Sequence, residues 1–84
     1  MHVVYIIQSI KYKKEIYKGY TTNLKNRLKK HNSGSVKHTA QYKPWKLIFY
    51  AVFSNKKNAI AFEKYLKSGS GIAFMRKRLI NCHN

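Results

Sequence analysis

The sequence predicts an α+β fold, in which a small three-stranded antiparallel sheet is flanked by about three helices in the order ββαβαα. Two short segments rich in Val, Ile and Tyr come first, and the polar turn between them is typical of a β-hairpin. Segments with helical spacing of apolar residues follow, with one longer apolar segment between them. The chain has 84 residues and no internal repeat, so we expect a single domain over residues 1–84.

The first two predicted strands cover residues 2–8 and 15–21. A short polar segment, residues 10–14, connects them, so we expect an antiparallel hairpin. A loop of about five residues would close this hairpin with Tyr5 opposite Tyr17.

Successive side chains of a strand point to opposite faces, so the hairpin has two distinct sides. One face carries Tyr5, Tyr17 and Gly19. The other face carries Val4, Ile6 and Ile16, which suits a hydrophobic core.

A helix is predicted over residues 24–32, because Thr22-Asn23 forms an N-cap ahead of apolar residues at helical spacing. Leu24 and Leu28 lie one turn apart and mark the buried side of this helix. The segment Asn32-Ser33-Gly34 ends the helix.

A polar, basic loop is predicted over residues 35–45, and a long apolar segment over residues 46–54 follows it. We expect the apolar segment to form the central strand of the sheet. The loop contains His38, Thr39, Pro44 and Trp45.

Two helices complete the predicted fold. Ser54-Asn55 caps a helix over residues 56–67, and Ser68-Gly69-Ser70-Gly71 separates it from a third helix over residues 72–81. The inward side chains of the second helix are Ala59, Phe62 and Leu66. Those of the third helix are Ile72, Met75 and Leu79, whereas Arg76, Lys77 and Arg78 point largely outward.

Charge is the most unusual feature of the composition. Eighteen Lys and Arg against two acidic residues give a formal net charge of +16, which favours polyanionic partners. The basic residues are spread along the whole chain, so we rank nucleic acid well above a membrane surface. The apolar N-terminal segment lacks a basic leader, and Cys82 is the only cysteine, so we expect a cytoplasmic protein without a disulfide.

Two tyrosine motifs, Val3-Val4-Tyr5 and Tyr17-Lys18-Gly19, precede an arginine and a histidine at helical spacing, Arg27 and His31. Phosphodiester hydrolysis needs a group that activates water, positive charge on the phosphate and usually a divalent metal ion. Tyr17 or Tyr5 can act as the base if a nearby cation lowers a tyrosine pKa that is ordinarily about 10. Arg27 can hold two phosphate oxygens, and His31 can share a proton with water or the leaving oxygen. Gly19 would allow backbone or phosphate to approach closely.

A metal ion has few possible protein ligands, because Glu15 and Glu63 are the only carboxylate side chains. Mg²⁺ prefers carboxylate oxygens and keeps several waters. Glu15 stands at the end of the hairpin, where it is expected to be a rim charge. Glu63 therefore indicates a site for a single metal ion.

Each of these residues also has an ordinary structural explanation. Tyr5 and Tyr17 can be cross-strand aromatic neighbours, and Arg27 can belong to a solvated basic helix face. His31 can favour the helix dipole near the C-terminus of its helix. Glu63 can pair with the lysine four residues later. It is the combination of these residues that favours a catalytic site.

The pattern resembles the GIY-YIG nuclease domain. Val3-Val4-Tyr5 stands where that family has Gly-Ile-Tyr, and Tyr17-Lys18-Gly19 stands where it has Tyr-Ile-Gly. The family's first-helix signature is matched by Thr22-Asn23-Leu24, Arg27, Leu28 and His31. The short, single-domain bacterial members are the most similar, through His31-Asn32-Ser33-Gly34, Thr39, Pro44 and Glu63-Lys64, and the resemblance covers about residues 2–80.

The resemblance implies a metal-dependent DNA endonuclease that is structure-selective, with a role in repair or recombination. Tyr17 would be the base, Tyr5 would assist or position water, and Arg27 would stabilise the phosphate. His31 would help proton transfer, and Glu63 would hold one Mg²⁺ or Mn²⁺ ion. The residues expected to contact nucleic acid are Lys18, Gly19, Lys25, Lys30, Lys37, His38 and Arg76.

Two positions differ from the family pattern: Val3 replaces the first glycine, and residues 70–75 lack the asparagine that many active members carry there. Two alternatives to a DNA nuclease follow. One is a nucleic-acid-binding module with the same fold and little or no catalysis, and the other is a basic RNA-associated structural protein. The oligomeric state stays open between a monomer and a weak dimer.

Overall fold

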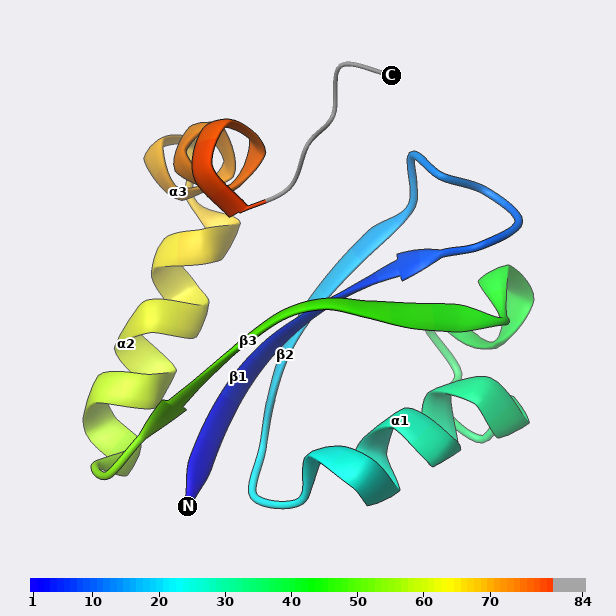
Figure 1. The fold of residues 1–84 in the computed structure, drawn as a ribbon, viewed down its shortest axis with the longest axis horizontal. Helices are drawn as coiled ribbons and strands as arrows, with labels where there is room; N and C mark the ends of the chain where they lie inside the picture. Colours follow the sequence, from blue (N-terminus) through cyan, green and yellow to red (C-terminus); the bar gives the residue numbers. More distant parts are fainter. Residues whose placement is uncertain (80–84) are drawn as a thin grey trace.

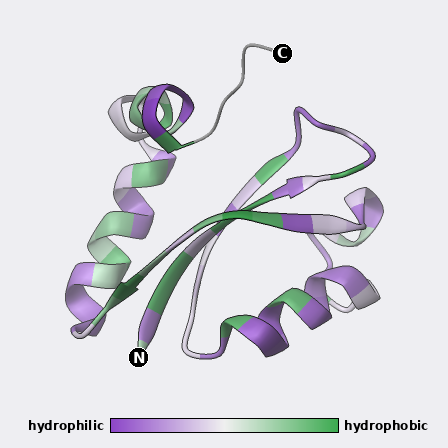
Figure 2. Cartoon of the chain, viewed as in Figure 1, coloured by the Kyte–Doolittle hydropathy of each residue, from purple (hydrophilic) through white to green (hydrophobic). Residues whose placement is uncertain are grey.

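The computed structural model describes residues 1–79 and contains a three-stranded antiparallel sheet with helices on both faces (Figure 1). Its elements are β1 (His2–Ser9), β2 (Ile16–Thr21), α1 (Leu24–Ser33), η1 (Ala40–Tyr42), β3 (Trp45–Phe53), α2 (Lys56–Lys67), α3 (Gly69–Phe74) and η2 (Met75–Leu79). The predicted α+β fold is therefore confirmed. Figure 2 shows that hydrophobic residues are concentrated along the strands, whereas α1 alternates between hydrophobic and hydrophilic residues.

The strand order is β2-β1-β3, so the prediction that residues 46–54 form the central strand was wrong. β1 is central, and every residue from Val3 to Ile7 is buried, as a strand covered on both faces requires. β3 is an edge strand in spite of its apolar composition. Its side chains Tyr50 and Val52 are accordingly 54% and 50% exposed.

The hairpin register also differs from the prediction. Tyr5 pairs with Gly19, and Ile7 pairs with Tyr17, so the predicted pairing of Tyr5 with Tyr17 was wrong by two residues. The turn closes with a hydrogen bond from the Ser9 N–H to the Glu15 carbonyl oxygen (3.0 Å), which encloses residues 10–14, the segment predicted to connect the strands. Because a shift of two residues keeps every side chain on its face, the predicted division of the hairpin into two faces is confirmed.

The two faces of the sheet build two separate cores. The core under α2 contains Val4, Ile6, Ala59, Leu66 and Met75, with Ile16 and Phe62 packed against it. The core under α1 contains Tyr5, Ile7 and Trp45, with Tyr17, Leu24, Leu28 and Leu47 packed against it. The candidate tyrosines Tyr5 and Tyr17 therefore belong to the α1 side, whereas Glu63 lies on α2.

The helices begin at the expected caps, but the third one starts early. The side chain of Asn23 accepts a hydrogen bond from the Asn26 N–H in α1, and that of Asn55 does the same for α2. The predicted helix 56–67 is confirmed. The predicted break after residue 67 is confirmed, but it is confined to Ser68, so the prediction that it extends to residue 71 was wrong.

Gly71 explains the early start of α3. It is buried within α3, and a Cβ atom there would overlap the carbonyl group of Tyr65 at the end of α2. The glycine is therefore a close helix contact and not a break. The end of the predicted third helix (residues 80–81) and Cys82 lie outside the described residues.

The segment between α1 and β3 is more ordered than the polar loop predicted over residues 35–45. It contains the short η1 turn, and Trp45 at its end is buried as the first residue of β3. The Asn32 side chain ties α1 to this strand, because its Oδ1 accepts from the Trp45 N–H and its amide donates to the Trp45 carbonyl oxygen.

Candidate active site

A tyrosine, a histidine and an arginine meet on the α1 side of the sheet. Tyr5 projects from the central strand and is fully buried. Its phenolic oxygen lies 2.8 Å from Nε2 of His31 and accepts a hydrogen bond from Nε of Arg27 at 3.3 Å. The ring of Tyr17 lies beside this group, with its centroid 5.1 Å from that of His31 and 6.3 Å from that of Tyr5.

The local structure explains why these four side chains converge. Strand alternation directs Tyr5 and Tyr17 to the same face of the hairpin. Leu24 and Leu28 seat α1 on that face. Arg27 and His31 lie one turn apart, so both reach Tyr5 from the same side of the helix.

Gly19 has a role that the sequence did not indicate. A Cβ atom at this position would lie 2.5 Å from the phenolic oxygen of Tyr5 and 2.7 Å from its Cζ atom. Any side chain here would therefore displace the Tyr5 ring. The group that approaches Gly19 closely is Tyr5 itself, in place of the backbone or phosphate that we predicted.

His31 is fully buried and uncharged at neutral pH. Its Nδ1 lies 2.7 Å from Oγ1 of Thr39, a residue on the segment that follows α1. Burial, with a smaller effect of the Arg27 charge, lowers the pKa of His31 to about 4. The alternative that His31 acts as a cation for the helix dipole was therefore wrong.

The electrostatics of Tyr5 and Arg27 favour a protonated phenol beside a permanent cation. Burial raises the pKa of Tyr5, although the hydrogen bond and charge of Arg27 oppose this effect. The hydrogen bond to Tyr5 raises the pKa of Arg27, and Tyr17 adds a smaller effect of the same sign. Tyr17 is only partly buried, so its side chain remains accessible from outside the core.

Glu63 lies on α2, on the opposite side of the sheet from Tyr5 and His31. Its side chain is 17% exposed, and its Oε2 lies 3.0 Å from Nζ of Lys67, which is the surface pair considered from the sequence. Glu63 contributes to the raised pKa of Tyr5 as the smallest of several causes, so the two groups lie within electrostatic range. Glu15 stands at the hairpin turn, where β2 begins.

The donor set fits a weakly held hard cation and no larger metal cluster. Within residues 1–79 no three His, Cys, Asp or Glu side chains lie close enough together to hold a metal ion. Glu63 can offer one carboxylate, and Mg²⁺ accepts one or two carboxylates together with waters and substrate phosphates. Glu63 therefore fits a single ion whose coordination shell is completed by water and substrate phosphate.

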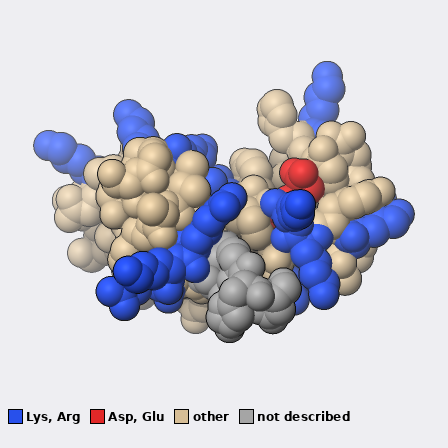
Figure 3. Space-filling view, turned by 90° about the horizontal axis from the view of Figure 1, so that it is seen from above, with Lys and Arg blue, Asp and Glu red and all other residues tan. Residues whose placement is uncertain are grey.

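The predicted nucleic-acid residues do not form one patch. Lys25 and Lys30 are both exposed on α1 but point about 140° apart, as helical geometry requires for residues five apart. The others lie elsewhere: Lys18 on β2, Gly19 beneath Tyr5, Lys37 and His38 before η1, and Arg76 on η2. Figure 3 shows basic side chains spread over one face of the molecule with little acidic surface between them.

Lys18 lies among other cations on the side of β2 that faces α2. It is partly buried, and burial lowers its pKa, with smaller contributions from Lys67 and Arg76. Within residues 1–79, the nearby negative charge comes from Glu63, through its ion pair with Lys67. The positive charges of Lys18, Lys67 and Arg76 outnumber the nearby negative charge of Glu63, so a bound phosphate would reduce their mutual repulsion.

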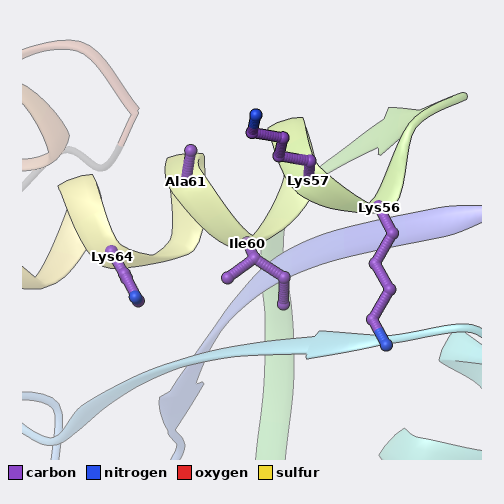
Figure 4. Close-up of a pocket in the computed structure, with 5 residues that line it drawn as sticks. All are labelled: Lys56, Lys57, Ile60, Ala61 and Lys64. Atoms are coloured by element: carbon purple, nitrogen blue, oxygen red, sulfur yellow. The ribbon is translucent and has the colours of Figure 1, made fainter.

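Two features of the structure had no predicted role. One is Thr39, whose hydroxyl contacts His31 from the segment that follows α1. The other is a shallow depression of about 480 Å³ on α2, lined by Lys56, Lys57, Ile60, Ala61 and Lys64 (Figure 4). It contains none of the predicted site residues. Its three lysines suit contact with the backbone of a polyanion better than they suit catalysis.

Comparison with known proteins identifies the family of the chain. A family model described as the GIY-YIG catalytic domain matches residues 1–74. A UPF0213 protein of Clostridium perfringens is 42% identical over 69 residues, which cover 80% of this chain and 71% of that protein. A UPF0213 protein of Pediococcus pentosaceus is 37% identical over 73 residues (82% and 77%), and one of Streptococcus pyogenes is 38% identical over 65 residues (76% and 68%). Among the described residues, every helix is too short or too polar to span a membrane.

Proposed function

The chain belongs to the GIY-YIG catalytic domain family, a family of nucleases, and from this premise we propose that it is a metal-dependent DNA endonuclease. The substrate is DNA with a branch, flap or lesion, met in repair or recombination in the cytoplasm. The observation that supports the proposal most strongly is the hydrogen-bonded contact of Tyr5 with both His31 and Arg27, beside the partly exposed Tyr17.

Each side chain has a role that its surroundings support. Tyr17 is the base, because its phenol is accessible and lies next to the Arg27 cation that a tyrosinate requires. Arg27 stays charged and holds the phosphate oxygens. Tyr5 is buried, so it orients Arg27 and does not itself contact substrate, and His31 accepts its hydrogen bond.

Glu63 would hold one Mg²⁺ or Mn²⁺ ion. When bound, the ion would supply positive charge for the phosphate and acidify a coordinated water. Lys67 would have to release the carboxylate, and its ammonium would then be free for a neighbouring phosphate. Lys18, Lys67 and Arg76 together extend this positive surface along the edge of β2.

A second candidate is a nucleic-acid-binding module that does not cut. The net charge of +16 and the lysines on α1, α2 and η2 favour it, because binding needs charge and no catalytic geometry. RNA is an alternative ligand for the same surface.

A nicking assay on supercoiled plasmid and on a synthetic flap tests the proposal, with Mg²⁺, Mn²⁺ or chelator. Tyr17→Phe and Glu63→Ala should each reduce cleavage by roughly 10²-fold or more and leave DNA affinity nearly unchanged. The matched controls are Tyr50→Phe, an exposed tyrosine of the same sheet, and Glu15→Ala, the only other carboxylate. Both controls should cut like the wild type.

Cleavage without metal, or retained in Tyr17→Phe, would overturn the assignment. Binding without cutting under every condition would favour the second candidate. Tighter binding to double-stranded RNA than to DNA at matched salt would identify RNA as the ligand.

A further inference from the structure

We infer that Thr39 is a positioning residue whose hydroxyl fixes His31 in the tautomer that carries its proton on Nδ1, so that Nε2 accepts the hydrogen bond of Tyr5. The inference rests on the proposed nuclease function for its catalytic consequence. Its structural part depends only on hydrogen bonds among Tyr5, Arg27, His31, Thr39 and Val36.

The hydrogen bonds around His31 run in one direction. The Thr39 hydroxyl donates to the Val36 carbonyl oxygen at 3.3 Å, so its Oγ1 is left to accept from Nδ1 of His31 at 2.7 Å. A neutral imidazole has a single N–H, so Nε2 carries no proton when Nδ1 does. Nε2 therefore accepts from the Tyr5 hydroxyl at 2.8 Å, and the Tyr5 oxygen accepts from Arg27.

The opposite tautomer leaves a buried hydrogen without an acceptor. If Nε2 carried the proton, it would donate to the Tyr5 oxygen, which already accepts from Arg27. The Tyr5 hydroxyl hydrogen would then have no partner, since His31 and Arg27 are its only hydrogen-bonding neighbours among the described residues. Tyr5 is fully buried, and an unpaired hydroxyl in that position is costly.

Thr39 is held firmly enough to impose this choice. It is 1% exposed, and its N–H donates to the Val36 carbonyl oxygen at 3.1 Å. Its own carbonyl oxygen accepts from Nε1 of the buried Trp45 at 2.9 Å. These contacts hold the main chain of Thr39 beside the His31 ring, with its hydroxyl on the Nδ1 side.

The tautomer decides what His31 can do. With Nε2 unprotonated, the ring accepts the Tyr5 hydroxyl hydrogen, and the Tyr5 oxygen is free to accept from Nε of Arg27, which orients the guanidinium. With Nε2 protonated, Nε2 and Arg27 would compete for the same oxygen, and the orientation of Arg27 would be lost. Thr39 thus acts on the reaction through His31 and Tyr5, without contact to the reacting phosphate.

Two variants separate the hydroxyl from the shape of the side chain. Thr39→Val keeps the branched shape and removes the hydroxyl, whereas Thr39→Ser keeps the hydroxyl. Nitrogen-15 spectra of the imidazoles report which ring nitrogen carries the proton, and His31→Gln assigns the His31 signals. Steady-state cleavage of the flap substrate gives kcat and KM for the same proteins, and circular dichroism reports their folding.

We expect His31 to carry its proton on Nδ1 in the wild type and in Thr39→Ser. In Thr39→Val the Nε2-protonated form should become populated, and kcat should fall by at least roughly tenfold with KM unchanged. Thr39→Ser should recover most of kcat.

A proton on Nε2 in the wild type would overturn the inference, whether or not Thr39→Val folds. An unchanged tautomer in a folded Thr39→Val protein would overturn it as well. If the wild type does not cleave DNA, the proposed function fails, but the spectra still decide the role of Thr39.

Discussion

Acidification should destabilise this protein through one buried histidine. His31 has a pKa of about 4 in the folded chain, against 6.5 for an ordinary histidine. Below pH 6.5 the unfolded chain therefore binds a proton that the folded chain refuses. The free energy of unfolding must then fall as the pH falls from about 7 to about 4, and this contribution stays constant below that range.

The size of the effect follows from the two pKa values. Each pKa unit corresponds to about 1.4 kcal/mol, so the full loss at pH 4 is about 3 kcal/mol, and about 2 kcal/mol is lost by pH 5. Small domains are commonly stable by only about 5–15 kcal/mol, so this loss would be readily measured.

Urea unfolding at several pH values between 7.5 and 4, at constant ionic strength, measures the effect. Trp45 is the only tryptophan and is 5% exposed, so its fluorescence reports on the core next to His31. His31→Gln is the reference, because it removes the titrating ring and keeps a polar side chain. The difference between the two pH profiles isolates His31 from every other titrating group.

Parallel profiles for the wild type and His31→Gln would refute the reasoning. They would mean that His31 gains its proton equally well in the folded and unfolded chains. The hydrogen bonds to Tyr5 and Thr39 would then not require a neutral ring.

Three further variants test separate parts of the site. Gly19→Ala should destabilise the fold by about 1–3 kcal/mol in urea unfolding, because its Cβ would meet the Tyr5 phenol. The control is Gly69→Ala, which should have a much smaller effect because no atom lies within 4 Å of the added Cβ. Lys67→Met should strengthen Mn²⁺ binding, followed by water proton relaxation, because it frees the Glu63 carboxylate; weaker binding would contradict the metal assignment. Lys18→Met should raise the stability of the free protein by removing a partly buried charge. It should also lower the slope of log K against log salt concentration for DNA binding by about 1, whereas an unchanged slope would place Lys18 away from the nucleic acid.

Local patterns predicted the elements of this fold better than their arrangement. The cap at Asn55 and the spacing of Ala59, Phe62 and Leu66 located α2 correctly, because these signals are contained within one helix. The two faces of the hairpin followed from alternation alone. Strand order did not follow, because the length of an apolar segment says little about which strand is covered on both sides. The uninterrupted apolar segment Val3-Val4-Tyr5-Ile6-Ile7, whose five residues are all buried, would have been the better signal for the central strand.

In the candidate site too, local spacing predicted some contacts, whereas contacts that depend on the arrangement of elements were missed. Helical spacing brought Arg27 and His31 to one side of α1, and the structure places both against Tyr5. The close approach of Tyr5 to Gly19 depends on the true register of the hairpin, which a loop of uncertain length did not reveal. The contact of Thr39 with His31 joins a helix to a loop, and no periodic pattern encodes such a contact.

Tyr5, His31 and Thr39 are among the most deeply buried side chains of the described chain, alongside Ile6 and Leu66. The two sides of the sheet must consequently differ in how they tolerate mutation. On the α2 side, aliphatic residues of similar volume can replace one another at modest cost. On the α1 side, replacement of Tyr5, His31 or Thr39 by an aliphatic residue would leave a donor or an acceptor unpaired in the interior, so these three residues would persist even in relatives without catalytic activity.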